Sequence, residues 1–152
     1  MRSNNRNQRN QRGTILAELA IGCLVTVSVA MFGLDIGTAM VCYGQNDRAC
    51  RDAARAAAQG STQAEAQNLA TSIVKTFANP SGLITSPQVV SVQYTDFNGT
   101  PPDGVSPFVT VTTRSTARPI APFSLFGRNV INGTFPLRKT YTFPIVKLNV
   151  NA

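Results

Sequence analysis

The chain has 152 residues, enough for one small domain and a membrane segment, and a formal net charge of +7. Four of its fourteen basic residues lie within the first 13 residues, so removal of that segment would leave a net charge of +3. This small charge argues against a nucleic-acid-binding protein, which needs a basic face on the folded domain. The chain also has no His, the usual general acid or base near neutral pH.

Residues 1–13 form a polar leader of low complexity that carries four arginines and no acid. Such a segment cannot build a core, and we expect it to be disordered or removed. A nucleic-acid-binding arm, as in a coat protein, is one interpretation. The other is a charge that keeps the N-terminus in the cytoplasm, and it is favoured because the leader directly precedes an apolar segment.

Residues 15–34 form that apolar segment, in which Glu18 is the only charge. A length of twenty residues matches the roughly 20 residues that span a hydrocarbon core of about 30 Å. Basic residues precede the segment and none follows it before Arg48. The N-terminus is therefore expected in the cytoplasm and the rest of the chain on the outer side of the membrane.

Glu18 lies one helical turn inside the apolar segment and five residues after Gly13. An ionised side chain at the centre of a bilayer costs about 2.5–3.5 kcal/mol on insertion scales, so acids within the membrane are functional candidates. Cleavage after Gly13 would make Thr14 a new N-terminus, and Glu18 of an adjacent subunit could then pair with its amine. The alternative is a protonated or snorkelling acid in a plain anchor helix.

The helical pattern continues beyond the apolar segment, and one helix over residues 14–59 would be about 69 Å long. Asp47 and Arg51 are spaced as an i,i+4 ion pair. Gly33 and Gly37 form a small-xxx-small pair of the kind that lets helices approach closely in lipid. Helix flexibility at the outer interface explains these two glycines equally well.

The cysteines are Cys23, inside the apolar segment, and Cys42 and Cys50. The last two would lie about 12 Å apart along a continuous helix, beyond the Cα separation of about 7 Å that a disulfide allows. They could form a disulfide only if the helix broke, as at Gly44, or between two chains. No metal-ligand spacing is present, and we expect no metal and no cofactor.

Residues 61–152 are expected to form the outer domain. Thr62 and Glu65 fit a capping box that begins a second helix ending near residue 78. Thr-rich alternation of β-branched and polar residues then predicts strands around residues 90–95, 109–112 and 140–145. The small core predicted for this domain implies that the long helix also covers one face of the sheet.

Two further signals concern the strands of this domain. Asn132 and Gly133 lie between apolar runs and predict a hairpin turn. Pro144 indicates an edge strand or a strand end. The fold class is therefore α+β, a long N-terminal transmembrane helix followed by a small domain of one helix packed on a three- to four-stranded antiparallel sheet.

These features resemble the TadE/TadG-like family, the minor pilins or pseudopilins of Flp (tight adherence) pili. The resemblance covers about residues 12–60 and has four parts: Gly13 with Glu18 as the prepilin cleavage motif, residues 17–20 as the Glu-centred signature, residues 32–37 as the Gly-containing end of the apolar run, and residues 49–58 as the Ala- and Arg-rich extension. In major Flp pilins an aromatic residue tends to follow the glutamate, whereas Leu19 stands here and a whole outer domain is appended.

The resemblance implies a structural role, and we expect no catalysis because a nucleophilic Ser or Cys in a chain without His lacks its usual base. A prepilin peptidase would cleave the chain at the cytoplasmic face of the bacterial inner membrane, and the chain would then assemble with other pilin subunits into a filament at the cell surface. No nucleic acid and no small-molecule substrate is expected. Two alternatives stay open: a larger pilin that forms the filament shaft itself, and an uncleaved single-pass anchor that presents a surface binding domain.

Overall fold

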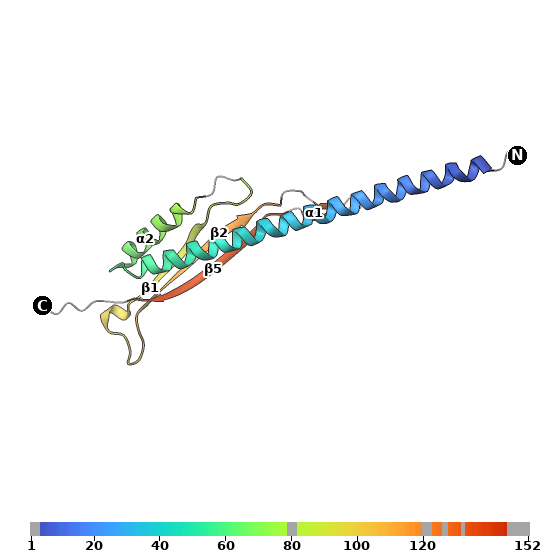
Figure 1. Ribbon diagram of the computed structural model, residues 1–152. Helices are drawn as coiled ribbons and strands as arrows, with labels where there is room; N and C mark the ends of the chain where they lie inside the picture. Colours follow the sequence, from blue (N-terminus) through green and yellow to red (C-terminus); the bar gives the residue numbers. More distant parts are fainter. Residues whose placement is uncertain (1–3, 79–81, 120–122, 126–127, 132, 146–152) are drawn as a thin grey trace.

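The computed structural model describes residues 4–78, 82–119, 123–125, 128–131 and 133–145. Its fold is α+β, as the sequence predicts. A long helix, α1 (Asn4–Ala57), runs the length of the molecule, and its N-terminal half projects away from the other elements (Figure 1). The second helix and the three-stranded sheet gather around its C-terminal half (Figure 1).

The helix α1 begins at Asn4, ten residues before the predicted start. Residues 4–13 of the leader are therefore helical, and the disorder expected for them in the uncleaved chain is not found. Arg and Gln are good helix formers, and each residue added to an existing helix gains a hydrogen bond without a new nucleation cost. The helix passes without a break through Gly33, Gly37 and Gly44 and ends at Ala57, close to the predicted end.

The helix α2 (Gln63–Thr76) begins at the predicted capping box. The Thr62 hydroxyl accepts a hydrogen bond from the Glu65 amide at 3.2 Å, and the Glu65 carboxylate accepts one from the Ser61 amide at 2.9 Å. Gly60 makes the tight connection from α1 possible, because a Cβ there would lie 2.8 Å from the Ala66 backbone nitrogen. The capping box and Gly60 together fold α2 back against α1.

Three antiparallel strands in the order β1-β2-β5 form the sheet: β1 (Gln88–Thr95), β2 (Phe108–Ala117) and β5 (Phe135–Pro144). A short 3-10 helix, η1 (Phe97–Gly99), lies between β1 and β2. The strand β5 is an edge strand and ends at Pro144, as the proline predicts. A separate pair of short strands, β3 (Phe123–Leu125) and β4 (Arg128–Ile131), joins β2 to β5.

The hairpin predicted at Asn132 and Gly133 is wrong, although Asn132 itself lies outside the described residues. The strands on either side belong to different sheets, because β4 pairs with β3 and β5 pairs with β2. An Asn-Gly pair favours a local reversal, but the ten-residue register between β2 and β5 offers far more cross-strand contacts than a pairing with four-residue β4.

The core lies between the sheet and the two helices. Alternate residues of β2 are buried towards α1, and they meet alanines of both helices; the buried cluster comprises Ala53, Ala54, Ala57, Ala66, Ala70, Val74, Val92, Val109, Val111 and Ile145. The small alanine side chains let the helix axes lie close to the sheet. The opposite face of the sheet is polar, and the hydroxyls of Thr110 and Thr142 lie 2.9 Å apart on it.

Candidate functional site

The N-terminal half of α1 carries large apolar side chains that no other described element covers. Residues 13–27 are exposed on every side of the helix. The most exposed large side chains of this half are each more than half accessible: Ile15, Leu16, Leu19, Ile21, Leu24, Val25, Val27, Val29, Phe32 and Leu34. By length and composition this helix can cross a membrane.

Hydroxyl groups within this apolar length are satisfied by the helix itself. Thr26 donates to the Gly22 carbonyl and Ser28 donates to the Leu24 carbonyl, each at 2.8 Å. In a bilayer no water is available to hydrogen-bond such groups, so these bonds lower the cost of burying Thr26 and Ser28 in lipid. Glu18 is then the one ionisable carboxyl group between residues 13 and 34.

Gly13, Thr14 and Glu18 lie together on this exposed helical stretch. Glu18 borders a shallow surface groove with Ile15, Leu19, Gly22 and Cys23, about 6 Å along the helix axis from Thr14. Within the part of the chain that the structure describes, no strand and no second helix approaches these residues. An opposite charge to pair with the Glu18 carboxylate would therefore have to come from outside this chain's described fold.

Gly33 and Gly37 face open space. No heavy atom lies within 4 Å of the position that a Cβ would take at either glycine. Both border a shallow apolar groove that also includes Val41, Leu83 and Ile84. The two glycines thus form a smooth strip on α1, beside the base of the outer domain, that nothing in the described chain uses for packing.

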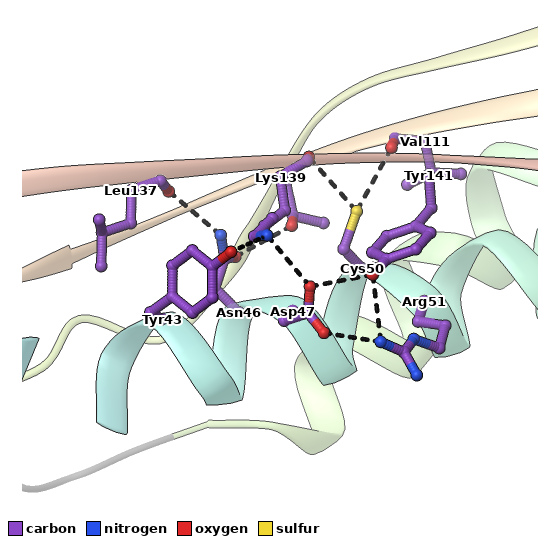
Figure 2. A network of polar contacts seen from close by, with 10 residues as sticks. Tyr43, Asn46, Asp47, Cys50, Arg51, Val111, Leu137, Lys139 and Tyr141 are labelled. Carbon is purple, nitrogen blue, oxygen red and sulfur yellow. Dashed lines mark hydrogen bonds and ion pairs between the residues drawn. The ribbon is translucent and has the colours of Figure 1, made fainter. Parts of the chain in front are cut away.

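Further along α1, a polar stripe of three buried residues faces the sheet: Cys42, Asn46 and Cys50. The Asn46 amide donates to the Leu137 carbonyl at 3.1 Å (Figure 2). The side-chain oxygen of Asn46 accepts from the Thr113 hydroxyl at 2.9 Å. The repeat of four residues places all three side chains on one helix face. Hydrogen bonds as well as apolar packing therefore hold α1 to the sheet.

Cys42 and Cys50 are free thiols. The Cys42 sulfur lies 3.2 Å from the Ser115 hydroxyl, and Cys50 donates to the Val111 and Lys139 carbonyls at 3.3 Å each. The break at Gly44 on which a within-chain disulfide depended is absent. Both side chains are fully buried, so a thiol of a second chain could not reach them in this fold. Burial also raises the pKa of Cys50, which lowers its fraction of reactive thiolate.

A charged cluster joins α1 to β5. The predicted pair of Asp47 and Arg51 is formed at 2.9 Å, and Asp47 also binds the Lys139 ammonium at 3.3 Å and the Tyr141 hydroxyl at 3.1 Å (Figure 2). Lys139 in turn donates to the Tyr43 hydroxyl. Desolvation would raise the pKa of Asp47, but hydrogen bonds from Tyr141 and Lys139 and the charges of Lys139 and Arg51 together hold it below its ordinary value.

The sequence analysis singled out the Asp47–Arg51 pair and missed its partners on β5. Lys139 and Tyr141 lie more than ninety residues from Asp47 in the chain, so no local spacing reports the contact. The only sequence signal is their two-residue separation, which places both side chains on one face of a strand.

No family model matches the chain, and neither a curated protein nor a solved structure matches it. Among the described residues, no group of three or more His, Cys, Asp or Glu side chains is placed to hold a metal ion. The features that carry a functional argument are therefore the exposed apolar length of α1, its single carboxylate, and the way the outer domain is fixed to the same helix.

Proposed function

We propose that this chain is a structural pilin-like subunit, a minor pilin or pseudopilin of a Tad-type pilus, which a prepilin peptidase cleaves after Gly13. The observation that supports the proposal is the exposed N-terminal half of α1. Its large apolar side chains need a lipid or protein environment, and the described chain offers no element to cover them.

The proposed chemistry centres on Glu18. Cleavage leaves the Thr14 amine as a positive charge at the start of the apolar helix, and Glu18 lies one turn further on. When helices of neighbouring subunits pack side by side, the carboxylate of one can pair with the amine of the next. Such a pair offsets the desolvation that an isolated carboxylate would keep, and it fixes the axial register of the two helices.

In this proposal the chain first sits in the bacterial inner membrane, with its N-terminus in the cytoplasm and the outer domain outside. The apolar helix then moves from lipid into contact with other pilin helices in a pilus at the cell surface. Gly33 and Gly37 offer a smooth strip at which a neighbouring backbone could approach closely. The same contacts would serve a larger pilin that forms the shaft itself.

A second candidate is an uncleaved single-pass anchor that presents the outer domain as a surface binding module. One observation favours it: α1 runs without a break from Asn4 across Gly13, so the leader is a natural extension of the membrane helix. In this alternative Glu18 is a protonated or snorkelling acid at the cytoplasmic end of the span.

Mass spectrometry of the N-terminus of the protein, isolated from its native membrane or surface fraction, separates the two candidates. A mature chain that starts at Thr14 is the expected result and supports prepilin processing. A chain that retains residues 1–13 would rule out the pilin proposal and leave the anchor.

The role of Glu18 is tested by Glu18→Gln, with Asp52→Asn as the matched control. Asp52 is an exposed acid on the same helix beyond the apolar length. We expect Glu18→Gln to keep cleavage after Gly13 but to lose most of the sheared, filament-associated protein, whereas Asp52→Asn assembles normally. Normal assembly of Glu18→Gln would show that the charge does not set the register.

A further inference from the structure

The exposed apolar surface of α1 extends beyond the length that a hydrocarbon core needs. Met40 is 69% exposed and Tyr43 is 48% exposed. From Ile15 to Tyr43 the helix rises about 42 Å at 1.5 Å per residue. A hydrocarbon core is only about 30 Å thick, but a bilayer with both headgroup layers is about 40–45 Å thick. The apolar length of α1 therefore matches the whole bilayer.

The base of the outer domain adds apolar side chains at the same level. Phe135, at the start of β5, borders one groove with α1, and Leu83, in the segment before β1, borders another. We call the exposed apolar residues at this level the collar: Met40, Tyr43, Leu83 and Phe135. Asp35 lies in the first groove but is only 8% exposed and takes part in an interaction, so it presents little charge at the surface.

Three exposed arginines lie at the same end of the sheet. Arg114 of β2 and Arg138 of β5 are directly opposite each other in the register, and Arg118 binds the Leu83 carbonyl through its backbone amide at 2.8 Å. The position of these arginines along α1 follows from Ser115, which is next to Arg114 in β2 and contacts Cys42 of α1. We call Arg114, Arg118 and Arg138 the basic belt, and it lies beside the collar.

The basic belt is not neutralised within the outer face of the sheet. That face carries mainly Thr, Ser, Gln, Pro and Arg residues, with Phe108 at the end away from the arginines, and it includes no acid. Like charges directly opposite each other in a sheet are destabilising. Asp96 and Asp103 lie beyond the opposite end of the sheet, in the connection between β1 and β2 that lies far from the projecting half of α1 (Figure 1). The arginines of this face thus lie at the end of the sheet near the projecting half of α1, and the two acids of the β1–β2 connection lie beyond the other end.

We propose that the base of the outer domain sits on the membrane, with the collar in the headgroup layer and the basic belt on the phosphates of anionic phospholipids. Tyr side chains are enriched at the membrane–water interface, which suits Tyr43, and each Lys or Arg near an anionic lipid surface strengthens binding. A second copy of the chain fits this surface less well than anionic lipid, because it would bring a second basic belt against the first. The inference rests on the membrane anchoring in the proposed function and not on filament assembly.

The experiment uses the absence of Trp from the chain, which makes any introduced Trp the sole indole fluorophore. The full chain is reconstituted in vesicles that contain brominated phosphatidylcholine, a quencher of Trp, with or without phosphatidylglycerol. Phe135→Trp and Leu83→Trp report on the collar. Val105→Trp, at the far end of the domain, is the matched control because Val105 and Phe135 are 43% and 41% exposed. Leu24→Trp reports on the span.

We expect quenching at positions 24, 83 and 135 and none at position 105. Phosphatidylglycerol should increase the quenching at positions 83 and 135. Replacing Arg114 and Arg138 with Gln should remove most of that increase, because each arginine near an anionic surface changes the docking equilibrium by about fivefold. Raising the salt concentration should have the same effect as these substitutions, since the surface potential is screened.

Three outcomes would overturn the inference. If position 24 is quenched but positions 83 and 135 are not, the helix is anchored and the domain stands clear of the membrane. If position 24 is not quenched either, the anchoring itself is wrong. If Trp emission at position 135 shifts to the blue with rising protein-to-lipid ratio but remains unquenched, a second copy covers the collar. A failure of pilus assembly would leave all of these readouts intact.

Discussion

The two halves of α1 are one continuous helix, yet they are built for different surroundings. The N-terminal half carries Leu, Ile, Val and Phe side chains that are mostly more than half exposed. The C-terminal half carries Ala49, Ala53, Ala54 and Ala57, which are fully buried against the sheet and α2. Both halves are helical, so the differences that matter are the size of the side chains and the presence or absence of a covering layer.

The difference indicates that the large exposed apolar residues of this helix are suited to an environment that the described chain does not provide. A half that is packed within its own chain uses small residues, because a close approach of helix and sheet leaves no room for larger ones. A half that awaits lipid or another helix can keep large side chains on every side. The covered half also buries Cys42, Asn46 and Cys50, each with a hydrogen-bond partner on the sheet.

The largest effect is expected from Asn46→Leu. This change keeps the approximate size of the side chain but leaves the Thr113 hydroxyl and the Leu137 carbonyl without their partner. Buried groups that lose a partner cost about 1–3 kcal/mol, so the outer domain should lose about 2–3 kcal/mol of its free energy of unfolding. Urea titration in detergent measures this loss of stability. Unfolding is followed by thiol labelling of buried Cys42 and Cys50, which mass spectrometry detects.

The double variant Asn46→Leu with Thr113→Val supplies the control for that prediction. It replaces both members of the buried pair with apolar groups and should recover part of the loss. If the single and double variants label at the same urea concentration, size and not hydrogen bonding determines the cost at this position.

A second prediction compares one substitution in both halves of the helix. Ala54 is fully buried and Ala30 is exposed. Ala54→Leu must overfill the core and should cost about 1–3 kcal/mol of outer-domain stability, whereas Ala30→Leu should leave it unchanged. The same thiol-labelling titration measures both. A loss of outer-domain stability in Ala30→Leu would mean that the two halves are energetically coupled. It would contradict the distinction between a covered and an exposed half.

Gly37→Ala tests whether a glycine in the exposed half serves contact with a neighbouring helix. A Cβ at this position meets no atom within 4 Å, so the isolated chain should be unharmed and its helix stabilised by up to about 1 kcal/mol. Assembly should nevertheless weaken, if a neighbouring helix uses the strip that Gly33 and Gly37 form. Hydrogen exchange across residues 33–41 measures the helix, and the filament-associated fraction measures assembly. Unchanged assembly would assign the glycine to flexibility.

The sequence predicted the elements of this fold better than their partners. The long helix, the Thr62 capping box and the edge strand ending at Pro144 follow from local rules and are confirmed. The hairpin at Asn132 and Gly133 was wrong, because strand pairing is decided by the total cross-strand contact and not by the turn alone. The helical leader was missed because its polar composition says nothing about whether a helix already formed will extend into it.

The candidate site divides in the same way. Glu18 can be identified from the sequence alone, because a single charge in an apolar run is costly and is therefore a functional candidate. The belt of Arg114, Arg118 and Arg138 cannot be seen there, because its members are distributed over three places in the chain. They come together only through the register of β2 with β5 and the backbone contact at Leu83.

The smallest effect concerns the cluster at Asp47, which ties the covered half of α1 to β5. Because its pKa is lowered in the folded state, Asp47 contributes stability above its ordinary pKa of 3.8 that is lost as the pH falls through the folded value. Asp47→Asn should therefore lower outer-domain stability near neutral pH by only a few tenths of a kcal/mol, as partly exposed ion pairs do. Below the folded pKa, wild type and variant should unfold at the same urea concentration, because the protonated carboxyl no longer carries the charge that pairs with Arg51 and Lys139.

Urea titrations at a series of pH values measure this difference in stability between wild type and Asp47→Asn, with Asp52→Asn as the variant outside the cluster. A difference that persisted in strong acid would assign the contribution of Asp47 to hydrogen-bond geometry with Tyr141 and not to its charge.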